Sequence, residues 1–143
     1  LDPAHADSYR KNALAFIKRL GKATKGWEAA LAKAKGAKVI AYHKTIVYFA
    51  DWLGLEVVEY VEPRPGIPPN PHHVTHVIDV AKSRGVKAIL HEVYYPAKNS
   101  ELIAKQTGAT LVKIPGGPDL KGGKTYVQHL DAVVKQLVKI YGN

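Results

Sequence analysis

The feature that most constrains this 143-residue chain is an alternation of short β-rich runs with helical segments from residue 39 onward. Strands are predicted at residues 39–42, 56–61, 86–90 and 110–114, and helices at residues 45–53, 71–84 and 97–107, with a last amphipathic helix after residues 115–124. Because short joints link these elements, the strands must be parallel and the crossovers right-handed. The sequence therefore predicts an α/β fold: a small doubly wound sheet of about four parallel strands, a Rossmann-like lobe.

A long amphipathic helix precedes this alternation, from Ala6 or Asp7 to about Lys35. Apolar residues recur at steps of three, four and seven on one side, and cations occupy the other. Gly21 and Gly26 lie inside the helix and lower its stability, so we expect a bend or a break there.

The charge is concentrated in the same helix. The chain has 21 Lys or Arg and 12 Asp or Glu, a net charge of +9, and residues 1–38 contain nine of the basic and three of the acidic residues. We interpret this as a solvated helix face and predict no nucleic-acid partner; binding to nucleic acid or to a membrane surface is the alternative. A chain that begins Leu1-Asp2-Pro3 and contains no Met is expected to be a processed or excised piece of a longer protein.

Candidate ligand residues follow the first and third predicted strands. In open α/β sheets, ligands bind at the carboxyl ends of the strands where the strand order reverses. His43 follows the first strand and opens a helix, whose positive end favours a neutral ring with a free lone pair; a capping role is the alternative. His91 and Glu92 end the third strand, and only one of them can face the site because neighbouring strand residues point to opposite faces.

Two further patterns resemble known binding motifs, but each lacks a residue that its motif requires. His72, His73 and His76 begin a helix with the histidine spacing of zinc proteases, but His73 stands where the catalytic Glu is needed. The loop 116–125 lies between a strand and a helix, as a phosphate-binding loop does, but Pro118 occupies a position that requires Gly. A phosphate- or nucleotide-binding module that uses this loop is the alternative function. No nucleophile is paired with a base, so we predict that the chain is not an enzyme.

Three segments resemble the zinc- and manganese-specific solute-binding proteins of bacterial metal ABC transporters, the ZnuA-like or TroA-like family. The first is Ala41-Tyr-His-Lys-Thr-Ile-Val-Tyr-Phe-Ala50, the second is Glu62-Pro-Arg-Pro-Gly-Ile-Pro-Pro-Asn-Pro71, and the third joins Val86-Lys-Ala-Ile-Leu-His-Glu92 with Thr107-Gly-Ala109. The resemblance covers essentially the whole chain. It implies a long inter-lobe helix at residues 1–36 and a C-terminal α/β metal-binding lobe at residues 37–143.

The resemblance also implies a ligand set. Such proteins hold the metal between two lobes, and His43 matches the ligand from the first strand of the C-terminal lobe. The fourth ligand in many members is an Asp or Glu after the last strand, where this chain departs from the pattern; Asp119, Glu92 or water are the candidates. A histidine at position 43 favours Zn²⁺, with Mn²⁺ as the alternative, since imidazole suits zinc better.

The implied partners are a missing N-terminal lobe, which supplies two more histidines, and an ABC transporter permease. The implied location is periplasmic or lipid-anchored on the extracytoplasmic face. One secure ligand cannot hold zinc tightly, so we expect weak or absent zinc binding by the isolated chain. Dimerisation or domain swapping through the apolar face of the long helix is a further expectation.

Overall fold

The computed structural model describes residues 2–142. Leu1, the first residue of the predicted inter-lobe helix, and Asn143, the last residue of the predicted C-terminal lobe, lie outside the described residues. The helices are α1 (Ala6–Ala30), α2 (Val47–Leu53), α3 (Pro71–Ser83), α4 (Lys98–Thr107) and α5 (Tyr126–Tyr141), with three short 3₁₀ turns at Pro3–His5, Ala32–Ala34 and Lys44–Ile46. The strands are β1 (Lys38–Ala41), β2 (Glu56–Tyr60), β3 (Ala88–Glu92) and β4 (Thr110–Ile114). The predicted alternation of strands and helices is confirmed, and the bounds of most elements agree to within two residues.

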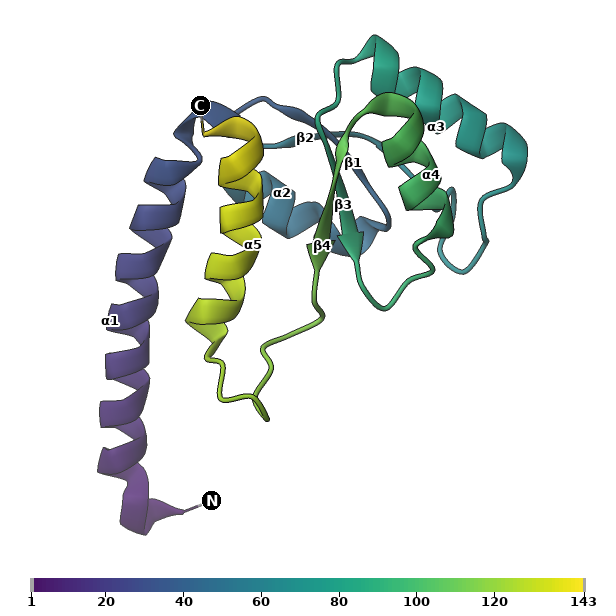
Figure 1. The fold of residues 1–143 in the computed structure, drawn as a ribbon. Helices are drawn as coiled ribbons and strands as arrows, with labels where there is room; N and C mark the ends of the chain where they lie inside the picture. Colours follow the sequence, from purple (N-terminus) through teal and green to yellow (C-terminus); the bar gives the residue numbers. More distant parts are fainter. Residues whose placement is uncertain (1, 143) are drawn as a thin grey trace.

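The four strands form one parallel sheet in the order β2-β1-β3-β4. The chain leaves β1 to build β2 on one side and then returns to build β3 and β4 on the other. The strand order therefore reverses between β1 and β3, as the doubly wound prediction requires. Figure 1 shows α1, α2 and α5 on one side of the sheet and α3 and α4 on the other.

Alternate residues of the central strands face the two helical layers. Val39 and Ala41 of β1 pack into the cluster that includes Leu31, Leu53 and Leu137, whereas Ile40 packs into the cluster of α3 and α4. The same alternation in β3 sends Leu90 to the first cluster and Ile89 to the second. Because both faces are covered, these strands are apolar along their whole length, as buried parallel strands are.

Two details differ from the sequence prediction. The long helix α1 runs without a break through Gly21 and Gly26 and ends at Ala30, five residues before Lys35. Of the predicted bend or break, the break is therefore wrong: the roughly 1 kcal/mol cost of each glycine is small beside the packing of the helix end, where Trp27 is buried. Strand β3 is shifted two residues toward the carboxyl end, which places His91 and Glu92 within the strand rather than after it.

The long helix extends past the sheet. In Figure 1 the arrowheads of β3 and β4 point toward the side on which α1 begins, and the amino-terminal half of α1 continues beyond α5 on that side. Several apolar side chains in this half are exposed: Tyr9, Leu14, Phe16 and Ile17. Over residues 2–142, no helix combines the length and the apolar character needed to cross a membrane.

Candidate metal centre

His43 lies at the carboxyl end of β1, beside the point where the strand order reverses. Its backbone is extended and its ring caps the short turn Lys44–Ile46: the Thr45 backbone N–H donates to His43 Nδ1 over 3.1 Å. The capping role that the sequence left open is therefore present. It uses only Nδ1, so the second ring nitrogen, Nε2, is left for another partner.

The partner of that nitrogen is Glu62, which lies two residues after the end of β2. Glu62 Oε2 lies 3.2 Å from His43 Nε2, and the side chains of His43 and Glu62 are 18% and 8% exposed. The contact is within ion-pair distance, but Glu62 Oε2 is buried and forms no hydrogen bond to any of residues 2–142. A nearly buried carboxylate oxygen therefore faces the candidate ligand without a donor of its own.

Glu92 reaches the same site from β3 through Thr45. The Thr45 hydroxyl donates to Glu92 Oε1 and lies 3.3 Å from His43 Nδ1. Glu92 is buried, and its other oxygen, Oε2, has no hydrogen-bond partner among the described residues. Glu92 thus acts on His43 indirectly, in the manner of the carboxylates that orient metal-binding histidines.

His91 points the other way, which agrees with the prediction that only one of the two residues can face the site. Its Nδ1 lies 3.0 Å from the Ser100 hydroxyl of α4, and its ring packs edge-on against Tyr42. Burial lowers the pKa of His91. His91 is thus a core histidine that packs against α4.

An aromatic surface covers the site. Tyr95 stacks on both Tyr42 and His43, with ring centroids 4.5 Å and 5.5 Å apart. Burial raises the pKa of Tyr42, and the negative charges of Glu62 and Glu92 raise it further. Both carboxylates therefore act on one phenol, and the site has the negative character that attracts a cation.

Asp119 is not brought to this site. It is exposed in the loop before α5, where its Oδ1 accepts the Gly122 N–H over 2.9 Å, and no contact joins it to His43. Across residues 2–142, no three His, Asp or Glu side chains gather closely enough to hold one metal ion. The assignments of His43, Glu92 and Asp119 as ligands remain predictions, and the described part of the chain supplies less than a full ligand set.

The loop 116–125 uses its own backbone amides internally. The amides of Leu120, Gly122, Gly123 and Lys124 donate to acceptors within the loop, and the Thr125 amide donates to the side chain of Gln128. Thr125 in turn caps α5 by accepting the Gln128 amide. A phosphate-binding loop needs free amides, so this arrangement speaks against the alternative function.

The histidines at the start of α3 are also occupied elsewhere. His73 bonds to the backbone carbonyl of Tyr60 over 2.9 Å, and His76 pairs with Glu59 over 3.1 Å. Each ring thus has its own partner at the flank of β2, and the described residues around them do not form a metal cluster.

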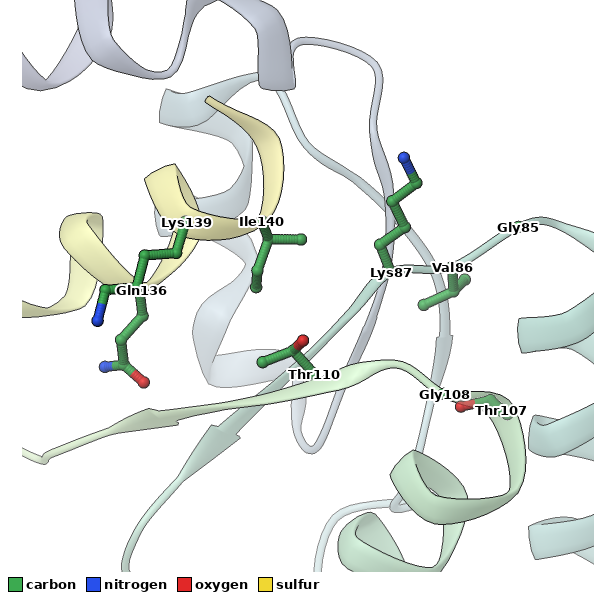
Figure 2. A pocket seen from close by; sticks show the side chains of 9 residues that line it. All are labelled: Gly85, Val86, Lys87, Thr107, Gly108, Thr110, Gln136, Lys139 and Ile140. Atoms are coloured by element: carbon green, nitrogen blue, oxygen red, sulfur yellow. The ribbon is translucent and has the colours of Figure 1, made fainter. Parts of the chain in front are cut away.

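A shallow hollow of about 660 Å³ lies at the opposite end of the sheet, near the starts of β3 and β4. Figure 2 shows it between α5 and these strands, lined by Lys87, Thr110, Gln136 and Lys139 among others. The two ammonium groups point away from one another in this view, so they do not converge on a common ligand.

Comparison with known proteins decides the family. The family described as "Zinc-uptake complex component A periplasmic" matches residues 1–140. The chain belongs to this family. It is 29% identical over 123 residues to the high-affinity zinc uptake system protein ZnuA of Brucella abortus, which covers 85% of this chain and 37% of that protein.

Solved structures of similar proteins agree with this family assignment. The laminin-binding adhesin Lmb of Streptococcus agalactiae, 28% identical, superposes with a TM-score of 0.77 over 98% of this chain and 53% of the adhesin. The solute-binding protein FpvC of Pseudomonas aeruginosa, solved with Mn²⁺, is 29% identical with a TM-score of 0.72, over 98% of this chain and 54% of FpvC. The chain thus spans about half of these structures and 37% of the Brucella protein.

Glu62 is the site residue that sequence reasoning missed. In the sequence it is only the first residue of a Pro/Gly-rich motif. Yet its position resembles that of His43, because it lies just after the end of a strand, β2, which pairs with β1. The missing information is the burial of its carboxylate, which a loop position does not predict.

Proposed function

We propose that this chain is the C-terminal metal-binding lobe, residues 37–143, with the inter-lobe helix, residues 1–36, of an extracytoplasmic zinc-binding protein. It captures Zn²⁺ in a cleft between two lobes and delivers it to an ABC transporter permease. Membership of the zinc-uptake family supports this role, and the relatives' greater length supports a second lobe. The chain binds and transfers its ion without catalysis, and its location is periplasmic or lipid-anchored.

The observation that carries the proposal is the state of His43. Its ring is fixed at Nδ1 by the Thr45 amide, and Nε2 faces a buried carboxylate at the switch point of the sheet. Imidazole nitrogen with carboxylate oxygen is a donor set that zinc accepts readily. The amino-terminal half of α1, with its exposed apolar side chains, lies on the same side as the carboxyl ends of the strands, which supports a second lobe closing over His43.

The test is zinc titration of the 143-residue chain by calorimetry. Zinc usually takes four ligands, so we expect a dissociation constant weaker than about 1 μM, which corresponds to about −8 kcal/mol. His43→Ala should abolish the measurable binding. His72→Ala is the matched control because it removes an exposed histidine outside the site, and it should bind like the parent chain.

Two results would contradict the proposal. The first is submicromolar zinc affinity that His43→Ala leaves unchanged. The second is a weakening by His72→Ala equal to that by His43→Ala, which would mean that histidines bind zinc without regard to their place. Titration with Mn²⁺ under the same conditions should give the weaker response, since His43 favours zinc.

A further inference from the structure

The carboxylate of Glu62 is the least satisfied polar group at the carboxyl end of β2. Its side chain is 8% exposed, and Oε2 is buried with no hydrogen-bond donor among residues 2–142. Burial of a carboxylate oxygen is costly unless a hydrogen bond, an opposite charge or a metal compensates. Among residues 2–142, Glu62 Oε2 makes an ion-pair contact with His43 Nε2, at 3.2 Å.

The loop after β2 holds this carboxylate in place. Glu62 Oε1 accepts the Gly66 N–H over 2.9 Å, and the Ile67 amide closes a turn onto the Arg64 carbonyl over 2.9 Å. Gly66 has a φ of +78° and follows Pro65, the combination that a type II turn requires. The motif Glu62-Pro-Arg-Pro-Gly thus fixes one carboxylate oxygen and directs the other to His43.

His43 is fixed from the opposite side. Its Nδ1 contacts the Thr45 amide and hydroxyl, and that hydroxyl donates to Glu92. Because Nδ1 accepts the Thr45 N–H, the proton of a neutral His43 ring lies on Nε2, toward Glu62. A cation that binds Nε2 must displace this proton, and the ring can then carry its proton on Nδ1, 3.3 Å from the Thr45 hydroxyl.

The spacing of the two atoms suits a shared ion. Zinc bonds to nitrogen and oxygen are about 2.0–2.1 Å long, so two ligands of a tetrahedral site lie about 3.3 Å apart. His43 Nε2 and Glu62 Oε2 are 3.2 Å apart, although they do not meet the geometry of a hydrogen bond. We propose that Glu62 is a second metal ligand from this chain, and that it supplies the carboxylate that Asp119 does not bring to His43.

This assignment rests on the proposed function and sharpens it. The chain then contributes one nitrogen and one oxygen ligand, and a second lobe needs to add only two ligands for a four-coordinate site. The alternative is that Glu62 only pairs with a protonated His43 and never contacts the ion. The two roles differ in whether the Glu62 carboxylate itself responds to the metal.

The experiment uses the 143-residue chain labelled with ¹³C at the glutamate carboxylates and ¹⁵N at the histidine rings. Zn²⁺ is titrated while NMR follows the Glu62 carboxyl carbon and His43 Nε2, with the Glu62 signal assigned by its loss in Glu62→Gln. We expect both signals to shift with the same dissociation constant. The Glu59 carboxyl carbon, which lies at the flank of the sheet beside His76, should not shift.

Calorimetry then compares two variants. Glu62→Gln should weaken zinc binding by about 10-fold or more, at least as much as loss of a group that only orients a ligand. Glu59→Gln, which alters a carboxylate that pairs with His76, should stay within about twofold of the parent. The NMR result on the unaltered chain keeps the test decisive even where Glu62→Gln folds poorly.

The outcomes separate this inference from the proposed function. A Glu62 carbon that does not move on zinc addition overturns the ligand assignment, even where Glu62→Gln weakens binding. Binding by Glu62→Gln equal to that of the parent overturns it as well, and the proposed function survives as long as His43→Ala abolishes binding. Binding that neither variant affects overturns both.

Discussion

The two ends of the sheet differ in a way that shows what marks a functional site. The amino end has an open hollow of about 660 Å³, but its lysines are exposed and diverge (Figure 2). The carboxyl end has two buried carboxylates, Glu62 and Glu92, each with an oxygen that lacks a hydrogen-bond donor among the described residues. A concave surface alone therefore identifies the wrong end of the sheet, whereas the carboxylate oxygens that folding leaves without a hydrogen-bond donor identify the other end.

The physical reason is the difference in desolvation. An exposed lysine keeps its water and its position carries little information, because most lysines are exposed. A buried carboxylate loses its water and destabilises the fold unless something compensates. A cation bound at the carboxyl end would compensate for this loss of water. If this end of the sheet is adapted to bind a cation, its buried carboxylates lower the stability of the fold when no cation is bound.

Among the substitutions that compare the two ends, the largest expected effect comes from Thr45→Val, which removes the hydroxyl between His43 and Glu92 with little change in shape. Glu92 would keep a buried carboxylate with no donor, which costs about 1–3 kcal/mol of unfolding free energy. Zinc affinity of the chain should fall about 10-fold, because His43 loses the group that orients it. Urea unfolding and zinc calorimetry measure the two effects.

Thr45→Ser is the control because it keeps the hydroxyl. It should retain most of the stability and the zinc affinity of the parent. Equal behaviour of the Val and Ser variants would show that the hydroxyl contributes nothing, and the carboxyl end of the sheet would then lose its distinction from the amino end.

A smaller effect is expected from Gly66→Ala, which tests the loop that holds Glu62. The added methyl group meets no atom within 4 Å, so the cost comes from the positive φ alone, about 1–2 kcal/mol for a left-handed residue with a side chain. Zinc affinity should fall with it if the turn directs the Glu62 carboxylate. Gly117→Ala is the matched control, since Gly117 is also free of contacts but has no positive φ.

Stability within about 0.5 kcal/mol of the parent in both glycine variants would contradict this account. It would mean that the turn after β2 rearranges freely, and that the position of Glu62 Oε2 beside His43 does not depend on it. Thermal unfolding and the zinc titration described above supply both readouts.

The sequence predicts the fold well, because the spacing of apolar residues and the short loops between strands and helices determine it. Buried parallel strands have continuous apolar runs, and Gly54 and Gly108 end helices in the left-handed conformation that their position suggests. The crossovers then limit the strand order, so the sequence alone is enough to expect His43 at the switch point. The unbroken α1 is mispredicted because tertiary packing outweighs the propensity of two glycines.

The site is only half predictable. The chemistry and position of His43 are visible in the sequence, but the register of β3 is not, and a two-residue shift decides that Glu92 is buried in the strand. Glu62 is missed because its role depends on a turn four residues further on, which bends its carboxylate back over the end of β1. Such a contact between two loops has no periodic signal.

The smallest effect should come from the amino end, where Tyr141 near the end of α5 carries a buried hydroxyl without a partner among the described residues. Tyr141→Phe removes that hydroxyl, so the unfolding free energy should rise by up to about 1 kcal/mol, and zinc affinity should not change. A gain in stability without a change in zinc affinity would distinguish this neutral hydroxyl, which is only a defect in packing, from the unsatisfied carboxylates at the other end of the sheet.

The pH dependence of Tyr141 gives the same comparison a second readout. Burial raises the pKa of Tyr141 to about 12, whereas an unfolded tyrosine has a pKa near 10. Between these values the unfolded chain releases the proton and the folded chain keeps it, so the parent loses stability as the pH rises above about 10. Tyr141→Phe should lack this contribution, and the difference between the two unfolding curves should therefore widen with pH. Curves that stay parallel would show that the hydroxyl reaches water in solution, and the amino end would then contain no buried polar atom of this kind to compare with Glu62 and Glu92.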